Sequence, residues 1–284
     1  MNPFILYNNL FAEGTPTATS TATGYDIVNI NDWRTFTKWK ANVSGTTYLY
    51  PNVSGVFDTL CIIGHNLSTC GALISIEWSA DNATSWTEIV APFFVFDDYA
   101  ICKTFTKIDP IDGLLLADTG DFIITDSDDY ISVSSTKYPR IKIVTSGSIT
   151  PEIAICVLGE RTQFPMAIKS MPTLYNIGIV GETSVSKQGN ILNTVIKYRP
   201  VTITHEYVME IGNYVWLTGD FKDFWINHGS LMKPFFYVFD NINYPNDTYL
   251  MRLIEDSLYT LPMIFRSKAT VTNFSLAMEG ILEQ

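Results

Sequence analysis

Hydrophobic and polar residues alternate along several short segments of this chain. Within residues 71–81, Ile74, Ile76 and Trp78 are separated by polar or small residues, which is the period of two expected of a half-buried strand. The preceding segment 58–67 is largely apolar and ends in Gly-His-Asn-Leu. The two segments predict strands joined by a short polar turn, as in a hairpin of a β-sandwich. The first inference therefore concerns architecture, because this stretch carries no catalytic signature.

Similar patterns recur between residues 25 and 160, where short apolar or alternating runs are separated by turn residues. The run from Arg140 to Val144 alternates and predicts a strand with one solvated face. Residues 153–158 are apolar throughout, which favours a central strand. Many short strands with regular turns are typical of a sandwich or jelly roll. We therefore predict a mainly β protein whose N-terminal domain, residues 25–160, is a jelly-roll β-sandwich.

The chain changes character at residues 159–165, where we place a domain boundary. Residues 195–209 predict a long strand that contains Pro200, which a sheet tolerates at an edge or a bulge. Residues 161–284 therefore form a β-rich domain, in which the pattern at 220–229 predicts one short helix. Phe221, Phe224 and Trp225 would form the aromatic face of this helix. Asp220 is the predicted N-cap, and Gly229 is the predicted C-terminal stop.

The first 24 residues form an N-terminal arm or linker in this scheme. Residues 12–24 are small and polar with Gly and Pro, which indicates an extended segment. The segment before them is apolar and includes Phe4 and Leu6. Two alternatives remain open for it: a first strand of the protein's own sheet, or an arm that reaches a neighbouring subunit.

Length and composition limit the function classes. With 284 residues, 46% of them hydrophobic, the chain is long enough for two packed cores. A net charge of −11 without any basic run argues against binding to a nucleic-acid backbone. No apolar run is long enough to span a bilayer, and the N-terminus does not resemble a secretory signal. The four cysteines lack the spacing of a zinc site and are expected to be reduced core thiols, although Cys61 and Cys70 could pair across the turn.

Two groups of residues carry a resemblance to known proteins. Gly64-His65-Asn66-Leu67, followed by an alternating strand and the turn from Asp81 to Trp86, resembles discoidin-like, carbohydrate-binding-module-like sandwiches in virion proteins of tailed bacteriophages. The second group comprises residues 158–160, 164–165, 220–225, 233–240 and 274–280. This group resembles the ring-forming domain of distal tail proteins. The resemblance implies a structural virion protein of the phage tail tip or baseplate, assembled in the cytoplasm of a bacterial host.

Catalytic motifs are not recognisable in the sequence. Only three histidines are present, and neither a nucleophile elbow nor a phosphate-binding glycine loop occurs. The chain is therefore predicted not to be an enzyme, and a glycan depolymerase is the least favoured reading. His65 is expected to be a structural histidine that bonds a loop carbonyl, with ligand contact as the alternative. The candidate carbohydrate-binding residues are Trp33, Trp39, Trp86 and His65, with Tyr48 and Tyr50 as further aromatic candidates, whereas Trp78 is expected in the core.

No cofactor is predicted, except that the acidic segment around residue 126 could hold a structural calcium ion. Related sandwiches often bind calcium through loop carboxylates, and the tentative ligands here are Asp126, Asp128 and Asp129. The segment lacks the full loop pattern of an EF-hand. A solvated loop is the alternative interpretation.

The resemblance implies assembly as the main function. We expect a homo-oligomeric ring, six-fold or three-fold, with other phage tail proteins as partners and without nucleic-acid binding or membrane insertion. The predicted assembly interface comprises Phe4, Leu6, Phe235 and Phe236. The alternative function is a receptor-binding module in which the sandwich binds a carbohydrate of the host surface.

Overall fold

The computed structural model describes residues 2–114, 132–165, 174–178, 180–188, 191–209, 214–243, 247–254 and 272–282. The protein is mainly β, as predicted. The chain forms two compact units: residues 8–98 with 103–160, and residues 1–7 with 99–102 and 161–284. The predicted domains differ from these units mainly in the first 24 residues, which are divided between the two units.

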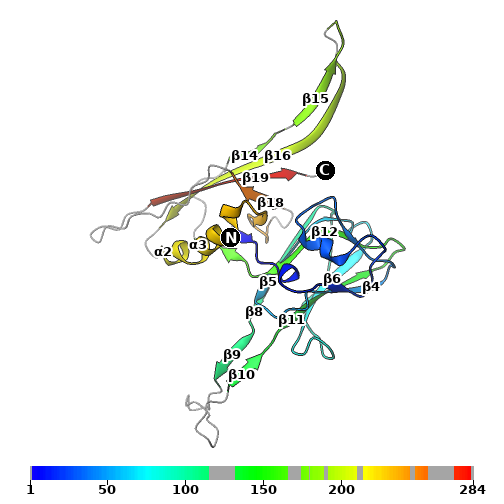
Figure 1. Cartoon of the computed structure of the whole chain (residues 1–284), viewed down its shortest axis with the longest axis vertical. Coiled ribbons are helices and arrows are strands. Elements are labelled where there is room, and N and C mark those ends of the chain that lie inside the picture. Colours follow the sequence, from blue (N-terminus) through cyan, green and yellow to red (C-terminus); the bar gives the residue numbers. More distant parts are fainter. Residues whose placement is uncertain are drawn as a thin grey trace, which may run out of the picture. The chain divides into compact units, whose positions relative to one another are not determined.

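The unit formed by residues 8–98 and 103–160 is a β-sandwich (Figure 1). One sheet has the order β2-β4-β11-β6-β7: Thr17–Ala18, Thr46–Tyr50, Tyr138–Thr145, Ala72–Ser79 and Thr87–Phe94. The other has the order β3-β12-β5-β8: Trp39–Lys40, Glu152–Gly159, Phe57–His65 and Ala100–Ile108. A separate two-stranded ribbon pairs β9 with β10: Ile111–Leu114 and Ser132–Ser135.

Strand β11 shows how the sequence pattern produces the sandwich. Its burial alternates strictly, with Ile141 and Ile143 fully buried and Arg140 and Lys142 on the opposite, partly exposed face. The prediction of a strand with one solvated face is therefore confirmed. Strand β12 is buried from residue 153 to 159 and pairs with strands on both sides, as expected of a central strand.

The predicted hairpin between β5 and β6 is wrong in one respect. The two strands are consecutive, but they belong to different sheets, so the polar turn between them crosses from one layer of the sandwich to the other. Sequence alternation predicts the strands but not their partners: β6 pairs with β7 and β11, whereas β5 pairs with β12.

Two short helical segments flank the first sandwich strand, β2. Helix α1 (Leu10–Glu13) starts at Asn9, whose side-chain oxygen accepts a hydrogen bond from the Phe11 amide, as N-cap residues do. The 3₁₀ helix η1 (Ile27–Asn31) starts at Asp26, which caps Val28 in the same way.

The second unit is built on one large sheet with the order β13-β1-β17-β18-β19-β16-β14, in which β15 also pairs with β16. The strands, in that order and with β15 last, are Thr162–Gln163, Phe4–Leu6, Phe235–Val238, Thr248–Leu253, Thr272–Leu282, Ile191–Met209, Leu174–Ile177 and Val180–Val185. The apolar N-terminal segment is thus a strand of the protein's own sheet, one of the two alternatives left open by the sequence.

Strand β16 explains how Pro200 is accommodated. On one side β16 pairs with β14 through residues 201–204 and then with β15 through residues 191–198 (Figure 1). Pro200 lies where the partner changes, and its carbonyl accepts a hydrogen bond from the Gly178 amide. Because proline has no N–H to donate, this break between two partner strands tolerates it.

The predicted helix is present as α3 (Asp220–Asn227), preceded by α2 (Tyr214–Thr218) and followed by the 3₁₀ helix η3 (Gly229–Leu231). In the described part of this domain the predicted short helix is therefore present, with the five-residue helix α2 before it. Phe221 and Phe224 are fully buried and Trp225 is partly buried, as the spacing predicts. The N-cap position is Gly219, one residue before the predicted Asp220, and no side chain caps it. No helix in the described ranges is long and apolar enough to cross a membrane.

Candidate functional site

An aromatic and charged cluster lies on the outer face of the sheet that contains β11. We call it the Trp86 surface, and it comprises Tyr48, Tyr50, Glu77, Trp86 and Arg140. Tyr48 and Tyr50 alternate with the fully buried Leu49 on β4, so both tyrosines lie on the face opposite the core. Trp86 comes from the turn between β6 and β7, and its ring meets that of Tyr50 edge to face, with centroids 5.6 Å apart.

The Arg140 guanidinium is the centre of this surface. Its central carbon lies 3.9 Å from the Trp86 ring centroid and 4.2 Å from that of Tyr48. Its Nε donates a hydrogen bond of 2.6 Å to Oε2 of Glu77, and Nη2 lies 2.5 Å from the same oxygen. Nη1 donates to the Tyr50 hydroxyl at 3.3 Å. The carboxylate and the aromatic faces replace water around the guanidinium, which offsets the cost of placing its charge in a partly buried position.

The turn that carries Trp86 is held in place by Asp81. One carboxylate oxygen accepts hydrogen bonds from the Ser79 hydroxyl and the Ala83 and Thr84 amides, and the other accepts from the Thr84 hydroxyl. The side-chain hydrogen bonds from Ser79 and Thr84 lower the pKa of Asp81, followed by the two amide bonds. Asn82 has a left-handed φ of 56° and donates to the Asn52 side chain. These contacts fix the turn at the edge of the aromatic cluster.

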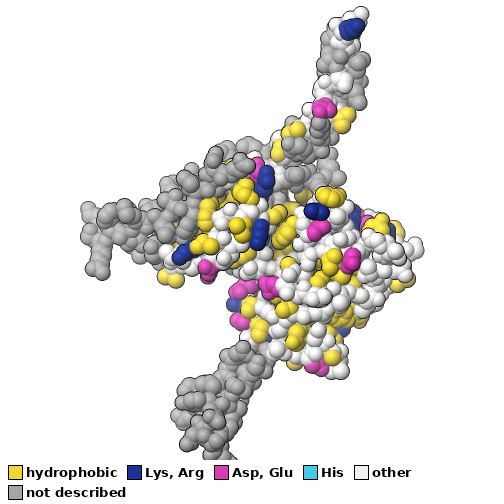
Figure 2. Space-filling view, in the orientation of Figure 1, with side chains coloured by type: hydrophobic (Ala, Val, Ile, Leu, Met, Phe, Trp, Pro, Cys, Tyr) yellow, Lys and Arg dark blue, Asp and Glu magenta, His cyan; other side chains and the backbone are white. Residues whose placement is uncertain are grey.

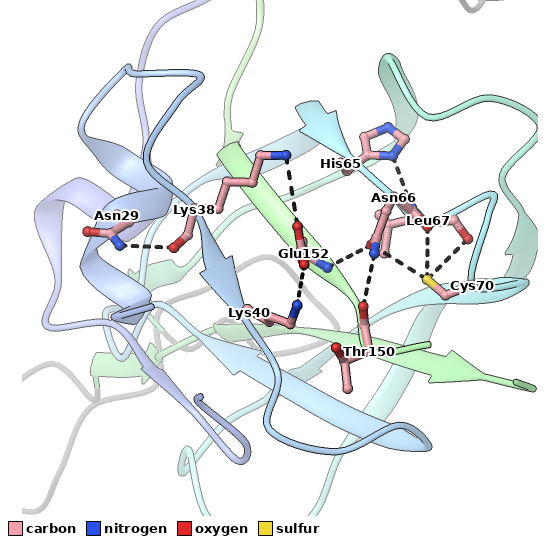
Figure 3. Close-up of polar contacts among 9 residues, drawn as sticks. All are labelled: Asn29, Lys38, Lys40, His65, Asn66, Leu67, Cys70, Thr150 and Glu152. Atoms are coloured by element: carbon pink, nitrogen blue, oxygen red, sulfur yellow. Dashed lines mark hydrogen bonds and ion pairs between the residues drawn. The ribbon is translucent and has the colours of Figure 1, made fainter. Parts of the chain in front are cut away.

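A second polar region lies at the opposite end of β6, in the turn that links β5 to β6. We call residues 65–71 the His65 turn (Figure 3). His65 is 4% exposed, and its Nδ1 accepts a hydrogen bond of 3.3 Å from the Leu67 amide. Its Nε2 is buried without a hydrogen-bond partner. His65 is thus structural, as predicted, but it accepts from an amide and does not bond the loop carbonyl that the sequence suggested.

Burial controls the protonation of this turn. Desolvation lowers the pKa of His65 to about 4, against a smaller opposing effect of the Asp98 and Asp97 charges. The Asp98 carboxylate accepts hydrogen bonds from the Ser68 and Thr69 amides and from the Thr69 hydroxyl. Burial alone would raise the pKa of Asp98, but these hydrogen bonds outweigh it and lower that pKa. Near neutral pH, the turn therefore holds a neutral imidazole beside a fixed carboxylate.

The strands next to the His65 turn add an ion pair, and the turn itself contains a buried thiol (Figure 3). Lys40 donates to Glu152 at 2.5 Å, and this bond raises the pKa of the ammonium group. Lys38 lies 3.9 Å from the other oxygen of Glu152. The Cys70 thiol bonds the Asn66 carbonyl at 3.0 Å, and burial raises its pKa to about 11. Such a thiol is a poor nucleophile near neutral pH, and all four cysteines are free and buried.

The structure separates the four predicted carbohydrate-binding residues. Trp39 is fully buried, and its indole N–H donates to the Thr21 hydroxyl, so it cannot offer a ring face to a ligand. The burial of His65 makes ligand contact there equally inaccessible. Trp33 is partly buried, with a left-handed φ of 61°, in the loop after η1. Trp86 is partly exposed and alone of the four belongs to the Trp86 surface.

The predicted assembly and calcium residues have different outcomes. Phe4, Leu6, Phe235 and Phe236 are at most 1% exposed. These four side chains pack inside the chain and expose almost no apolar surface to a partner. The assembly interface therefore stays a prediction. Asp126, Asp128 and Asp129 lie outside the described residues. Among the residues that the structure does describe, no three His, Cys, Asp or Glu side chains are grouped to hold a metal ion.

Sequence reasoning missed Arg140 and Glu77 as site residues. Both are charged residues on alternating strands, which normally means a solvated face. Glu77 is nevertheless 7% exposed because β11 places Arg140 directly opposite it. The sequence does contain one signal, which is the presence of Glu77 and Arg140 at alternating positions of two predicted strands. Such a pair can form only if the two strands are neighbours in one sheet. Trp78, expected in the core, is partly exposed, with the Lys137 ammonium 3.5 Å from its ring centroid.

The sequence matches no family model and no curated protein. Among solved structures, it is similar to chitosan-binding module 1 of a chitosanase/glucanase from Paenibacillus sp. IK-5, with 16% identity over 54% of this chain and 100% of the module, at a TM-score of 0.36. A pectin-binding carbohydrate-binding module shows 18% identity over 51% of this chain and 89% of its own, at a TM-score of 0.34. The CBM32 of AlyQ, in complex with 4,5-unsaturated mannuronic acid, shows 16% identity over 54% and 96%, also at 0.34.

At identities and TM-scores this low, the likenesses identify no family and assign no ligand to this chain. All three structures are named as carbohydrate- or chitosan-binding modules, and none is named as a phage protein. The resemblance to phage tail proteins therefore stays a prediction.

Proposed function

We propose that the β-sandwich is a carbohydrate-binding module that holds its ligand at the Trp86 surface. The observation that carries the proposal is the Arg140 guanidinium between the rings of Trp86 and Tyr48, tied to Glu77 on the outer face of a sheet. This surface combines partly exposed aromatic rings with planar polar groups, which is the combination that a saccharide requires.

The chemistry of a sugar ring matches both kinds of group. Its C–H face is apolar and packs on an aromatic ring, while its hydroxyls take hydrogen bonds from side chains at the edge of that ring. Trp86 and the two tyrosines supply rings. Arg140 supplies N–H donors, and the tyrosine hydroxyls can both donate and accept.

The surface is also fixed in position before any ligand arrives. Arg140 is held by Glu77, Tyr50 and two ring faces, and the Trp86 turn is held by Asp81. Rigid aromatic side chains lose little conformational entropy on binding, so a preformed surface of this kind favours affinity. Both oxygens of Glu77 are engaged by cations, Arg140 and Lys142, so the proposal gives this surface a binding role and no catalytic step.

Binding of the full chain to a glycan array tests the proposal. We expect the wild type to bind at least one saccharide, and Trp86→Ala to weaken that binding by about five- to thirtyfold, because removal of one stacking ring costs roughly 1–2 kcal/mol. Phe36→Ala is the matched control, since Phe36 is 79% exposed in another loop of the same unit. Tyr48→Ala provides a second test if the first variant does not fold. Loss of binding in Phe36→Ala but not in Trp86→Ala or Tyr48→Ala would move the site elsewhere, and no binding to any glycan would refute the function.

A further inference from the structure

We infer that the ligand of the Trp86 surface is an uncharged saccharide, and that Glu77 is the residue that excludes acidic ones. The inference rests on the proposed function, and it concerns the class of ligand that the same surface accepts. It follows from how completely the charges of this surface are matched.

The positive charge of Arg140 is already paired with the carboxylate of Glu77. Its Nε and Nη2 lie 2.6 and 2.5 Å from Oε2 of Glu77, and the two side chains are only 13% and 9% exposed. A carboxylate or sulfate of an acidic saccharide would have to displace Glu77 to form the same paired contact. Displacement would leave the Glu77 carboxylate with little access to water, and an unpaired charge in such a position is strongly unfavourable.

The aromatic rings strengthen this exclusion. The guanidinium lies within 4.2 Å of the centroids of both Trp86 and Tyr48, and ring faces attract a cation as an anion does, though more weakly. Because Glu77 and the rings together satisfy the charge, the N–H groups of Arg140 that do not contact Glu77 or Tyr50 act as ordinary donors. A saccharide hydroxyl can accept from such a group without any charge of its own.

The neighbouring positions on this face do not create a surplus of positive charge. Lys142 lies 3.6 Å from Oε1 of Glu77, so one carboxylate serves both cations. Glu88 is exposed on β7 at the register position opposite Glu77 and supplies the second carboxylate. Two cations therefore face two carboxylates, on a chain whose net charge is −11.

The described part of the face drawn in Figure 2 shows no basic patch that could attract a polyanion. On the face drawn in Figure 2, Lys and Arg side chains stand singly among acidic, polar and hydrophobic ones throughout the described part. At a net charge of −11, long-range electrostatics repel an acidic polysaccharide, whereas a neutral one is unaffected. The affinity for a neutral saccharide should also be insensitive to salt.

The experiment compares neutral, uronic-acid-containing and sulfated oligosaccharides on one array, using the full chain. We expect hits among the neutral oligosaccharides, with an affinity that changes by less than about twofold between roughly 0.05 and 0.5 M salt. Hits confined to acidic oligosaccharides, with affinity lost at high salt, would overturn the inference while leaving carbohydrate binding intact. Failure to bind any oligosaccharide would instead refute the proposed function.

A variant at Glu77 tests the role of this residue. Glu77→Gln keeps the shape of the side chain but leaves Arg140 and Lys142 without their shared carboxylate, so we expect a gain of about fivefold or more for acidic oligosaccharides, reversed by salt. Glu88→Gln makes the same change of net charge without touching Arg140 and should produce no such gain. If Glu77→Gln does not fold, the double variant Glu77→Gln/Arg140→Gln should bind acidic oligosaccharides no better than the wild type. Equal gains in the Glu77 and Glu88 variants, or any gain in the double variant, would contradict the role of Glu77.

Discussion

The Trp86 surface and the His65 turn lie at opposite ends of β6, and each contains a side chain that can carry a positive charge in a largely buried position. Arg140 has a carboxylate, a hydroxyl and two ring faces around its guanidinium. His65 has one amide on Nδ1 and no hydrogen-bond partner on Nε2. The charge of the first group is matched by a carboxylate and by ring faces, whereas burial lowers the pKa of the second to about 4.

The difference shows how unequally the two regions of this sandwich compensate a buried charge. Burial penalises a charge in both regions, so the outcome depends on what replaces water. On the outer sheet face, alternating strands place Glu77 and two tyrosines around Arg140, which compensates the charge. In the tight turn, the carboxylate with the largest charge effect on His65, that of Asp98, already accepts hydrogen bonds from the Ser68 and Thr69 amides and from the Thr69 hydroxyl. The imidazole therefore loses its proton rather than gaining a partner.

The largest expected effect comes from removing one member of the Arg140 pair. Glu77 is 7% exposed in the wild type, and Arg140→Ala leaves it with Lys142, at 3.6 Å, as its remaining described ion-pair partner. Breaking a buried pair costs about 3–5 kcal/mol, because the remaining charge keeps its desolvation penalty. We therefore expect the free energy of unfolding, measured in urea, to fall by about that amount.

The double variant Arg140→Met/Glu77→Leu separates the pair from its packing. Apolar residues of similar volume remove both charges, so most of the lost stability should return. A double variant that is as unstable as Arg140→Ala would show that packing on Trp86 and Tyr48, and not the unpaired carboxylate, causes the loss.

The next effect is a loss of stability in mild acid that is due to His65. Its folded pKa of about 4 lies below the ordinary value of 6.5, so the unfolded chain binds the proton more readily. Stability from this group is complete above pH 6.5 and is lost as the pH falls towards 4, by about 3 kcal/mol in total. Urea unfolding measured across this range should show the decline.

His65→Gln is the matching control, because it cannot titrate and its side-chain oxygen can still accept from the Leu67 amide. The difference between wild type and variant isolates His65 from His228, whose pKa is also lowered by burial. Asp98 acts in a separate window: its lowered pKa means that its contribution is lost only as the pH falls below its ordinary value of 3.8. An equal acid-induced loss in the variant would show that another group controls this transition.

The two regions also differ in how far the sequence predicts them. Local patterns predicted the strands that carry both, because alternation at 140–144 and the apolar run at 58–67 depend only on neighbouring residues. The turn that begins after His65 was predicted from the sequence Gly64-His65-Asn66, and the residue that adopts a left-handed φ there is Gly64, at 67°. The Trp86 surface could not be predicted as a unit, because it depends on β11 lying between β4 and β6, a pairing between segments far apart in the sequence.

Burial of individual aromatic residues was the least predictable property. Trp39 and Trp86 both occur among polar residues, yet Trp39 is fully buried and Trp86 is partly exposed. The difference arises because β3 pairs with the central strand β12, whereas Trp86 is in a turn at the edge of its sheet. Neither fact is visible in the spacing of the residues.

The smallest expected effect concerns Lys142, which contacts the same carboxylate as Arg140 but from a more exposed position. Its side chain is 31% exposed, and its nitrogen lies 3.6 Å from Oε1 of Glu77. An exposed ion pair of this kind contributes about 0.5 kcal/mol or less, because water and salt screen it. Lys142→Gln should therefore lower the free energy of unfolding by no more than about that amount, and the difference should vanish in high salt. A loss comparable to that of Arg140→Ala would mean that Glu77 needs both cations equally, and that the aromatic rings around Arg140 contribute little to holding its charge.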